Sequence, residues 1–462
     1  MDAETKTPPK DTLIIFSRYP QAGTAKTRLI PVLGAEGAAE LQRRMTEHAL
    51  AAATALNRRH PLAIEIHFED GGPEKMRDWL GAAATFRRQK TGDIGQRMRH
   101  ALAEVFAGQA DRAVLIGTDI PGITSDLLEK AYRLLADNDL VFGPAADGGY
   151  YLIGATAAAF QKLEGRLFDG IEWGGSRVLE QSLARAGEAG ATVERVETLT
   201  DVDRPADLPA WIARSRSNPP ARARPLISII IPSLNEAGHI GRTLASAAGQ
   251  PGIEILVVDG GSSDETVRIA SDQGARVYRT PASKAGQMNA GAALARGDVL
   301  LFLHADTRPP QNFGAHVRET LARPGVAAGA FRLGIDAAGG RLRFIETVAN
   351  VRSRFLGMPY GDQALFMTAE MFSAVGGYPD QPIMEDFELV RRLRQRGGIA
   401  IAPAAVATSP RRWLNVGVMK TWLINQSIVT AYLAGVSPGR LAGWYRREKG
   451  RPDPAVRTGQ SK

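Results

Sequence analysis

Short apolar runs bounded by polar residues recur along this chain. The clearest are Thr12–Phe16, the run from Val114 to Asp119, Leu226–Ile231, and the run from Val299 that ends at His304 and Asp306. Runs of this length bounded by polar residues predict buried strands, and buried parallel strands are apolar on both faces. Helical periodicity separates them, for example from Ala35 to Asn57. The alternation predicts an α/β fold with open parallel sheets.

The chain divides into two halves that follow the same plan. Each half opens with an apolar strand and reaches a later strand that ends in an acid and then a proline. Between the halves, residues 213–225 are polar, rich in proline and without periodicity, which is typical of a linker. We therefore expect one domain over residues 11–212 and a second over residues 226–450, with a shared fold and little residue-level identity.

Composition narrows the class of protein. The 462 residues carry a net charge of +8, dispersed and without a long basic block, which favours anionic substrates or an anionic membrane surface over nucleic acid. The absence of cysteine excludes disulfides and thiol catalysis. Residues 1–10 lack the apolar core of a signal peptide, and no window has 18 uninterrupted apolar residues, so we expect a cytoplasmic protein without a transmembrane helix.

The acids at the strand ends are the first candidates for chemistry. In an open parallel sheet, ligands bind beyond the carboxyl ends of the strands. Asp306 and Asp119 follow such strands, and a carboxylate there can hold Mg²⁺ or Mn²⁺ against a diphosphate. The alternative for Asp306 is a strand followed by a capping aspartate.

A cationic loop follows the first strand. It contains Arg18, Gly23, Lys26 and Arg28, and the glycine allows close approach of a phosphate that the cations would neutralise. The alternative is a solvated basic loop. Further along, the stretch Asp147–Tyr151 suits either a flat ligand or a β-turn.

Residues 11–212 resemble GT-A-like proteins related to nucleotidyltransferases such as phospholactate guanylyltransferase and the molybdopterin nucleotidyltransferases. The resemblance rests on F-x-R-x-P-x-x-G-x-x-K-T-R-L at Phe16–Leu29, T-D-x-P at Thr118–Pro121, D-G-G-Y-Y at Asp147–Tyr151 and D-V-D at Asp201–Asp203. It implies a nucleotide-binding fold with Asp119 near a metal.

In the second half, the residue pattern alone indicates two candidate sites at helix starts. Lys284, at the start of a helix, is placed to hold a phosphate, and the alternative is a plain capped helix. Glu385 and Asp386 lie in the first turn of another helix, whose dipole keeps them ionised, as a general base requires. Dipole capping alone is the alternative. Asp259 ends a strand and is predicted to face a ligand, and Glu236 to meet a nucleobase or ribose.

This half resembles the family 2 glycosyltransferases, which have a GT-A fold. The motifs are I-I-P-x-x-N-E at Ile230–Glu236, V-D-x-G-S-x-D-x-T at Val257–Thr266, G-x-x-x-N-x-G-x-x-x-x-x-G-D at Gly286–Asp298, and His304-Ala-Asp306 at the D-x-D position. His304 replaces the first acid of D-x-D, so Asp306 should carry most of the metal contact.

The resemblance implies roles for individual residues. Nucleotide binding falls to Pro232, Asn235, Glu236, Asp259, Lys284, Gly286 and Asn289. Asp386 is the expected base with Glu385 beside it, and Asp362, Gln363, Arg412 and Trp413 are expected to face the acceptor or sugar. Ser409 stands where processive members have glutamine, which disfavours a processive polymerase, and Arg411 or Arg412 would steady the departing diphosphate.

The expected activity is metal-dependent, inverting transfer of a sugar from a nucleotide diphosphate sugar to a small-molecule or lipid-linked acceptor. The first half is a second transferase, a nucleotidyltransferase that makes the donor, or a nucleotide-binding partner. Both halves resemble families placed in arsenosugar biosynthesis. A non-enzymatic alternative is a nucleotide-sugar sensor. The segment Val416–Leu433 and the cations after it either contact the inner face of the membrane or pack on the catalytic domain.

Overall fold

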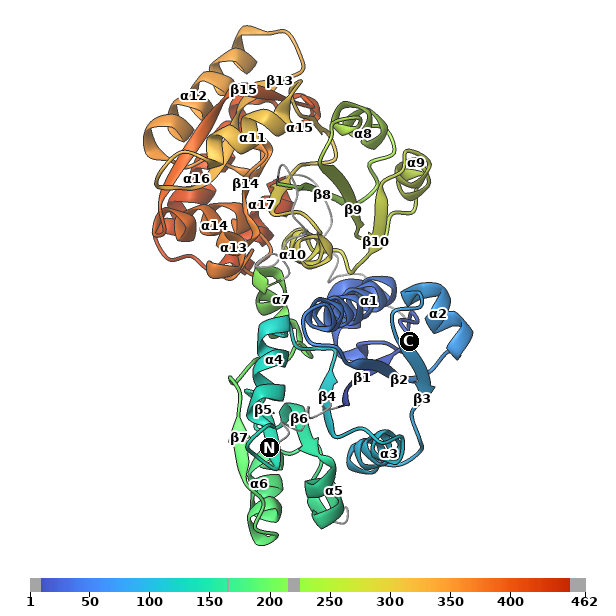
Figure 1. Ribbon diagram of the computed structural model, residues 1–462. Coiled ribbons are helices and arrows are strands. Elements are labelled where there is room, and N and C mark those ends of the chain that lie inside the picture. Colours follow the sequence, from blue (N-terminus) through green and yellow to red (C-terminus); the bar gives the residue numbers. More distant parts are fainter. Residues whose placement is uncertain (1–9, 164–165, 215–224, 449–462) are drawn as a thin grey trace, which may run out of the picture. The chain divides into compact units, whose positions relative to one another are not determined.

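The structure is a computed structural model that describes residues 10–163, 166–214 and 225–448. The chain divides into two compact units at about residue 210, each with one central β-sheet (Figure 1). The predicted linker coincides mostly with residues 215–224, which lie outside the described residues. The proposed domain limits therefore stay predictions.

The first unit has a seven-stranded sheet of order β3-β2-β1-β4-β6-β5-β7. Its strands are β1 Asp11–Arg18, β2 Ala63–Glu69, β3 Thr85–Arg88, β4 Arg112–Gly117, β5 Leu140–Pro144, β6 Tyr150–Thr156 and β7 Val193–Arg195. Its helices are η1 Thr27–Leu29, α1 Ile30–Asn57, α2 Pro73–Leu80, α3 Ile94–Ala107, α4 Ser125–Leu134, α5 Ala157–Leu163, η2 Arg166–Phe168, α6 Val178–Glu188, η3 Pro205–Asp207 and α7 Leu208–Arg214.

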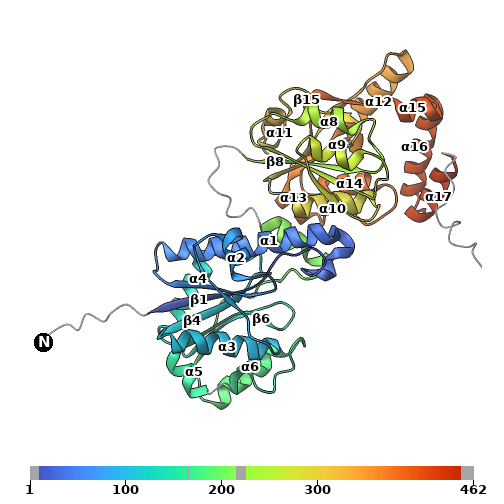
Figure 2. The same cartoon turned by 90° about the vertical axis from the view of Figure 1, so that its right-hand side faces the viewer.

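Helices cover both faces of this sheet because its central strand is apolar on both. Leu13 and Ile15 of β1 belong to a core shared with α1 and α4, whereas Ile14 belongs to a core shared with α3 and α6. Successive side chains of a strand point to opposite faces, so an unbroken apolar run requires a cover on each side. Figure 2 shows helices on either side of β1 and β4.

The second unit has an eight-stranded sheet of order β10-β9-β8-β11-β14-β13-β15-β12. Its strands are β8 Ile227–Ser233, β9 Ile253–Asp259, β10 Arg276–Arg279, β11 Val299–Phe302, β12 Thr307–Arg308, β13 Val326–Ile335, β14 Phe366–Thr368 and β15 Gly398–Thr408. Its helices are α8 Ile240–Ala247, α9 Thr266–Asp272, α10 Lys284–Leu294, α11 Phe313–Leu321, α12 Gly340–Leu356, η4 Gly361–Gln363, α13 Ala369–Ala374, α14 Glu385–Arg394, α15 Arg411–Val416, α16 Val418–Leu433 and α17 Pro438–Glu448.

The two sheets share a strand order, as the repeated sequence plan predicted. The order β3-β2-β1-β4 in the first unit matches β10-β9-β8-β11 in the second, and these strands are parallel in both. The predicted α/β class with two Rossmann-like sheets in tandem is confirmed. Neither sheet is fully parallel, because β6 and β14 run antiparallel to their neighbours.

Close packing of α10 on the sheet positions the start of that helix. A Cβ at Gly291 would lie 2.4 Å from Ile230 Cγ2 of β8 and 3.1 Å from Val258 Cγ2 of β9. Only glycine permits this approach. The helix therefore lies directly over β8 and β9, and its first residue, Lys284, reaches the carboxyl edge of the sheet.

The segment Val416–Leu433 corresponds mostly to one helix, α16 Val418–Leu433. Gly417, with φ of +92°, ends α15 and precedes α16, because few residues other than glycine adopt this conformation. Thr421 and Ile428 of α16 are buried, whereas Met419 and Leu423 are exposed. No helix in the described part of the chain has the length and apolar character needed to cross a bilayer.

Candidate functional site

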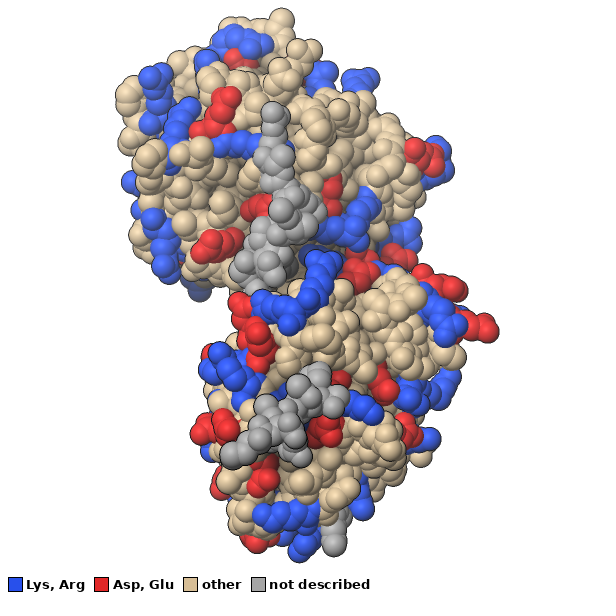
Figure 3. Space-filling model, viewed as in Figure 1, with Lys and Arg blue, Asp and Glu red and all other residues tan. Residues whose placement is uncertain are grey.

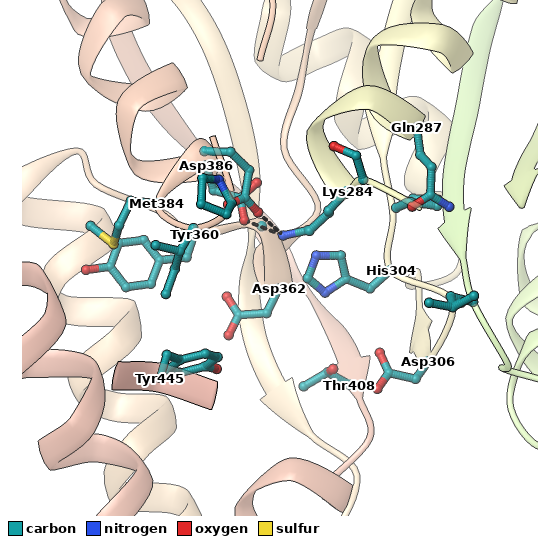
Figure 4. A pocket seen from close by; sticks show the side chains of 18 of the residues that line it. Lys284, Gln287, His304, Asp306, Tyr360, Asp362, Met384, Asp386, Thr408 and Tyr445 are labelled. Carbon is teal, nitrogen blue, oxygen red and sulfur yellow. Dashed lines mark hydrogen bonds and ion pairs between the residues drawn. The ribbon is translucent and has the colours of Figure 1, made fainter. Parts of the chain in front are cut away.

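A cavity of about 1050 Å³ opens beyond the carboxyl ends of β8 and β11 in the second unit. Asp306, from the loop after β11, and Asp386, from the start of α14, both line it. Figure 4 shows these two side chains, with Lys284, His304 and Asp362, arranged around one space. The two acids to which the sequence assigned metal and base roles therefore border a single cleft.

One carboxylate oxygen of Asp386 is bonded to Lys284, whereas the other has no protein partner in the part of the chain that the structure describes. Its Oδ2 accepts a hydrogen bond of 2.6 Å from Lys284 Nζ. Its Oδ1 is buried and has no hydrogen-bond partner among the described residues. A buried carboxylate oxygen without a partner is costly unless a ligand group completes it. Oδ1 is therefore the atom of this side chain suited to accept a proton or hydrogen bond from a substrate.

Gly361 is needed for the position of Asp386. A Cβ at Gly361 would lie 2.4 Å from Asp386 Oδ2 and 2.8 Å from Oδ1. The turn at η4 can approach the carboxylate this closely only because residue 361 has no side chain. No local pattern in the sequence reveals this role of Gly361.

Lys284 links the two acids at the start of α14. Its Nζ lies 2.8 Å from Glu385 Oε1 and 2.6 Å from Asp386 Oδ2. Burial by itself would lower the pKa of the Lys284 ammonium, but the Asp386 and Glu385 carboxylates outweigh it and raise this pKa above its ordinary value. Lys284 therefore stays a cation across the physiological pH range and supplies a positive charge at the edge of the cleft.

Glu388 is a further acid of α14, the helix that carries Asp386, and it forms ion pairs within this helix. Glu388 is buried in α14 and accepts hydrogen bonds from Arg391 at 2.8 and 2.9 Å and from Arg392 at 3.1 Å. The Arg391 guanidinium lowers the pKa of Glu388 against the opposing effect of burial, and Arg392 adds to it. A lowered folded-state pKa contributes stability above the unfolded pKa and loses it on acidification.

We expect Glu388→Gln to lower the free energy of unfolding by about 1 kcal/mol at neutral pH, since the arginine partners are half exposed. The difference from wild type should be complete above about pH 4.5, the ordinary value for glutamate, and should disappear as the pH falls through the lowered pKa. Urea unfolding at a series of pH values measures it. Glu370→Gln, at an exposed position of α13, is the matched control and should leave the curve unchanged. An equal loss at all pH values would contradict the assignment.

A second charged cluster surrounds Asp306. Arg411, at the start of α15, donates a 2.8 Å hydrogen bond to Glu236 Oε1 and lies 3.6 Å from Asp306 Oδ2. Burial raises the pKa of Asp306 and the Glu236 carboxylate raises it further, while Arg411 and His239 act in the opposite direction. The predicted nucleobase contact Glu236 and the predicted diphosphate contact Arg411 are thus paired with each other in this structure.

The side chains around Asp306 suit a metal ion that is held jointly by the protein and by the phosphates of a substrate. Within residues 10–163, 166–214 and 225–448, no three His, Cys, Asp or Glu side chains form a ready cage for a metal. Mg²⁺ is commonly held by one or two carboxylates together with substrate phosphates and water. Asp306, which offers its carboxylate oxygens at the rim of the cleft, matches that arrangement.

The other predicted residues of this half divide into two groups. Those that line the cleft are Pro232, Asn235, Glu236, Asp362, Glu385 and Trp413. Those that do not are Asp259, Gly286, Asn289 and Gln363. The side chain of Arg412 lies outside the described residues.

The four residues away from the cleft serve the fold. Asp259 is fully buried, and its carboxylate accepts hydrogen bonds from the backbone of Gly261 and Ser262. Asn289 bonds to the backbone of Tyr378 at 2.8 and 2.9 Å. These side chains already have protein partners, so we leave them out of the proposed donor site.

The same holds for Gln363 and Gly286. Gln363 is fully buried, donates to Phe331 O and accepts from Ser353 Oγ. The backbone N–H of Gly286 donates to the capping side chain of Ser283. Both ends of the Gln363 amide are therefore bonded to the protein, which does not match the predicted contact with a sugar.

Several lining residues were not among the predicted ones. Tyr360, Met384, Thr408 and Tyr445 face the cleft (Figure 4). The guanidinium of Arg352 lies 3.5 Å from the centroid of the Tyr360 ring and holds that ring in place. Tyr445 comes from α17, far along the chain, and only the tertiary fold brings it to the cleft.

The first unit has its own cavity, of about 580 Å³, beyond β1 and β4. Arg18, Lys26, Arg28 and Asp119 line it, whereas Gly23 does not. Lys26 is nearly enclosed, donates to Val202 O at 2.8 Å and lies 3.3 Å from Asp119 Oδ2.

The acids that line this cavity interact with nearby arginines and with one another. Arg28 is paired with Asp203, and Arg18 donates to Glu69 at 2.6 Å. Burial raises the pKa of Asp201, and Asp147 raises it further. The loop at Asp147 is a turn closed by a bond from Gly149 N to Asp147 Oδ1, and both residues line the cavity. The two interpretations of this loop, a turn and a ligand contact, are therefore compatible.

Both halves of the chain are similar to known protein families. Residues 228–374 match the family described as glycosyl transferase family 2, and residues 51–175 match a family described as uncharacterized protein conserved in bacteria (DUF2064). An uncharacterized glycosyltransferase of Mycobacterium tuberculosis is 30% identical over 181 residues, which are 36% of this chain and 68% of that protein.

Two solved structures are also similar. A putative nucleotide-diphospho-sugar transferase from Desulfovibrio desulfuricans is 35% identical and covers 46% of this chain and 90% of its own, with a TM-score of 0.42. A mannosyltransferase from Pyrobaculum calidifontis, in complex with GDP-Man and Mn²⁺, is 19% identical and covers 56% and 84%, with a TM-score of 0.37.

Proposed function

The chain belongs to glycosyl transferase family 2, and from this membership we propose that its C-terminal half moves a sugar from a nucleotide diphosphate sugar to an acceptor hydroxyl with inversion. The observation that carries the proposal is the shared cleft, in which Asp306 and Asp386 border one cavity of about 1050 Å³. Pockets of this size accommodate a nucleotide sugar and an acceptor group together.

The proposed reaction is a single displacement. The acceptor hydroxyl gives its proton to Asp386 Oδ1 while its oxygen attacks the anomeric carbon of the donor. The bond from that carbon to the diphosphate oxygen breaks on the opposite face, and the nucleoside diphosphate leaves with the electron pair. Attack from one face and departure from the other invert the anomeric carbon. Glu385 positions Lys284, with Nζ and Oε1 2.8 Å apart.

Charges at the cleft suit the anionic donor. Lys284 and Arg411 both line the cleft and are the proposed cationic contacts of the diphosphate. Mg²⁺ or Mn²⁺ would be held by Asp306, with His304 beside it, and when bound such a cation neutralises charge on the diphosphate. Pro232, Asn235 and Glu236, in the loop after β8, are the proposed contacts of the nucleoside.

The acceptor side of the cleft is proposed to lie between α14 and the C-terminal helices. Asp362 and Trp413 line it, as do Tyr360 and Tyr445. Aromatic faces with a nearby carboxylate suit a hydroxyl-bearing ring or an alcohol on an apolar carrier. The acceptor is therefore proposed to be a small molecule or a lipid-linked alcohol. The cytoplasmic location and the link to arsenosugar biosynthesis stay predictions from the sequence.

The experiment that tests the function is a screen of UDP and GDP sugars with the full chain, with and without Mn²⁺, that measures release of nucleoside diphosphate. We expect one donor to give release that Mn²⁺ stimulates and that a suitable alcohol accelerates. Binding of a donor without any release, in the presence of varied alcohols, would instead favour the nucleotide-sugar sensor.

The first unit is proposed to bind a nucleotide at the cavity that Lys26 and Asp119 line. Arg18, Lys26 and Arg28 would neutralise its phosphates, and Asp119 would contact a bound cation. A second transferase, a nucleotidyltransferase that makes the donor, and a nucleotide-binding partner all begin from such binding. The nearly enclosed ammonium of Lys26, at the carboxyl edge of the sheet, favours a phosphate site over a solvated basic loop.

We expect Lys26→Met to weaken nucleotide binding by the first unit about tenfold, because it removes one buried cation from the proposed phosphate site. Titration calorimetry of the full chain should then show one of two nucleotide sites weakened by that factor, while release of nucleoside diphosphate by the second unit is unchanged. Lys130→Met, at an exposed ion pair of α4, is the matched control. Loss of all nucleotide release in Lys26→Met would assign the transfer to the first unit instead.

A further inference from the structure

The helix α12 carries an apolar stripe on its solvent side. Phe344 is 51% exposed, Val351 51% and Phe355 74%, and Val348 between them is half-buried. The spacing of four, three and four residues places these side chains along one face of a helix. Leu356, 61% exposed, extends the stripe at the C-terminal end of the helix.

This stripe is not needed to hold α12 on the protein. The opposite face already packs, with Leu342, Ile345 and Ala349 buried in a cluster that includes Leu333 and Ile335 of β13. A helix attached to a domain by one face usually shows charged and polar residues on the other. An apolar second face is therefore available for a partner.

The stripe is part of a wider apolar surface. Of the ten exposed large apolar side chains in the described part of the chain, nine lie between residues 344 and 444. Trp422 and Val418 of α16 pack against the same cluster as α12, so the two helices are neighbours. Met419 and Leu423 of α16 are 44% and 56% exposed. We call the exposed residues Phe344, Val351, Phe355, Met419 and Leu423 the α12–α16 surface.

Positive charge accompanies this surface. Residues 389–447 contain ten Lys and Arg and no Asp or Glu, and three of these cations, Arg391, Arg392 and Arg411, are paired with acids elsewhere in the unit. On α12, Arg341 and Arg354 are exposed, whereas the one acid, Glu346, is buried and paired with Arg343. In Figure 3 blue side chains are frequent and red ones few over the region of α12 and α14.

We propose that the α12–α16 surface lies on an anionic lipid bilayer, with Phe344, Val351 and Phe355 in the boundary between headgroups and acyl chains. A helix with an apolar stripe flanked by cations binds such a boundary through burial of the stripe and attraction to anionic lipid. A second copy of this chain would bring the same positive charge to the contact, so charge complementarity favours lipid. The sequence suggested a membrane contact only at the C-terminal helix, and the structure moves its main part to α12.

Vesicle sedimentation with the full chain tests the charge requirement. We expect binding to phosphatidylcholine vesicles that contain phosphatidylglycerol, little binding to phosphatidylcholine alone, and weakening by salt. The double variant Arg341→Glu and Arg354→Glu should bind about 30-fold more weakly or worse. The double variant Arg133→Glu and Arg195→Glu changes the net charge equally at exposed positions of the first unit and should bind as wild type. Equal loss in both double variants would overturn the proposal.

A single label tests the position of the stripe, because the chain has no natural cysteine. Phe355→Cys, labelled with an environment-sensitive fluorophore, should shift its emission to the blue on addition of anionic vesicles. Ala51→Cys, at an exposed position of α1, should not. An unshifted label at residue 355 would overturn the proposal. A label shift that occurs without vesicles, increases with protein concentration and is accompanied by a doubled mass in light scattering would also overturn it, in favour of a contact with a second copy of the chain. The inference does not depend on glycosyl transfer.

Discussion

Asp386→Asn should lower kcat for sugar transfer about 10²- to 10⁴-fold, the usual contribution of a general base. The amide keeps the shape of the side chain but does not accept the proton of the acceptor hydroxyl. Oδ1, the buried oxygen without a protein partner, is the atom lost to chemistry. Donor affinity should change only a few-fold, since the predicted donor contacts lie at other residues. Steady-state release of nucleoside diphosphate and direct donor titration measure the two quantities separately.

Asp380→Asn provides the matched control, because Asp380 is exposed and lies six residues before Asp386. It should leave both kcat and donor affinity unchanged. Loss of turnover with retained donor binding in Asp386→Asn distinguishes the enzyme from the nucleotide-sugar sensor. Unchanged turnover in Asp386→Asn would remove the base from the proposed mechanism and leave only the donor site.

Asp306→Asn should lower kcat/KM for the donor about 100-fold or more and abolish stimulation by Mn²⁺. The carboxylate is the proposed support of the cation that faces the diphosphate, and removal of one such electrostatic element commonly costs 10²–10³ in rate. Unlike Asp386→Asn, this change should weaken donor binding as well. Activity over a series of Mn²⁺ concentrations, with donor titration in parallel, separates the two variants.

The control for Asp306→Asn is Asp336→Asn, which removes one carboxylate from an exposed ion pair with Arg308 at the end of β13. It should retain the activity and Mn²⁺ response of wild type. Full activity of Asp306→Asn with an unaltered response to Mn²⁺ would exclude Asp306 as the metal support. Arg411, 3.6 Å from Asp306, would then be the leading cation for the diphosphate.

The charged groups of the cleft are paired with each other before a donor binds. Lys284 holds Asp386, and Arg411 holds Glu236. A donor diphosphate competes with these carboxylates for the same cations, because an anion of higher charge attracts them more strongly. Donor binding is thus expected to loosen Asp386 from Lys284, which couples the arrival of the donor to release of the base.

The local pattern of residues was enough to predict the sheets. Apolar runs such as Thr12–Phe16 and Leu226–Ile231 became the central strands β1 and β8, and the acids Asp119 and Asp306 follow the strands beside them. These features depend on neighbours in the sequence, because a strand buried on both faces must be apolar throughout. The repeated plan of the two halves was visible for the same reason, and the first four strands have the same order in both sheets.

The direction of side chains depended on residues far apart in the chain. Asp259 and Asp306 both follow apolar strands, yet one is enclosed by the backbone of its own turn and the other borders the cleft. Gly361 admits Asp386 to its position, and Tyr445 arrives from α17. The sequence by itself determined which acids end at the rim of each sheet. Only the tertiary structure decided which of them share a cavity, because that depends on packing between elements that no local pattern records.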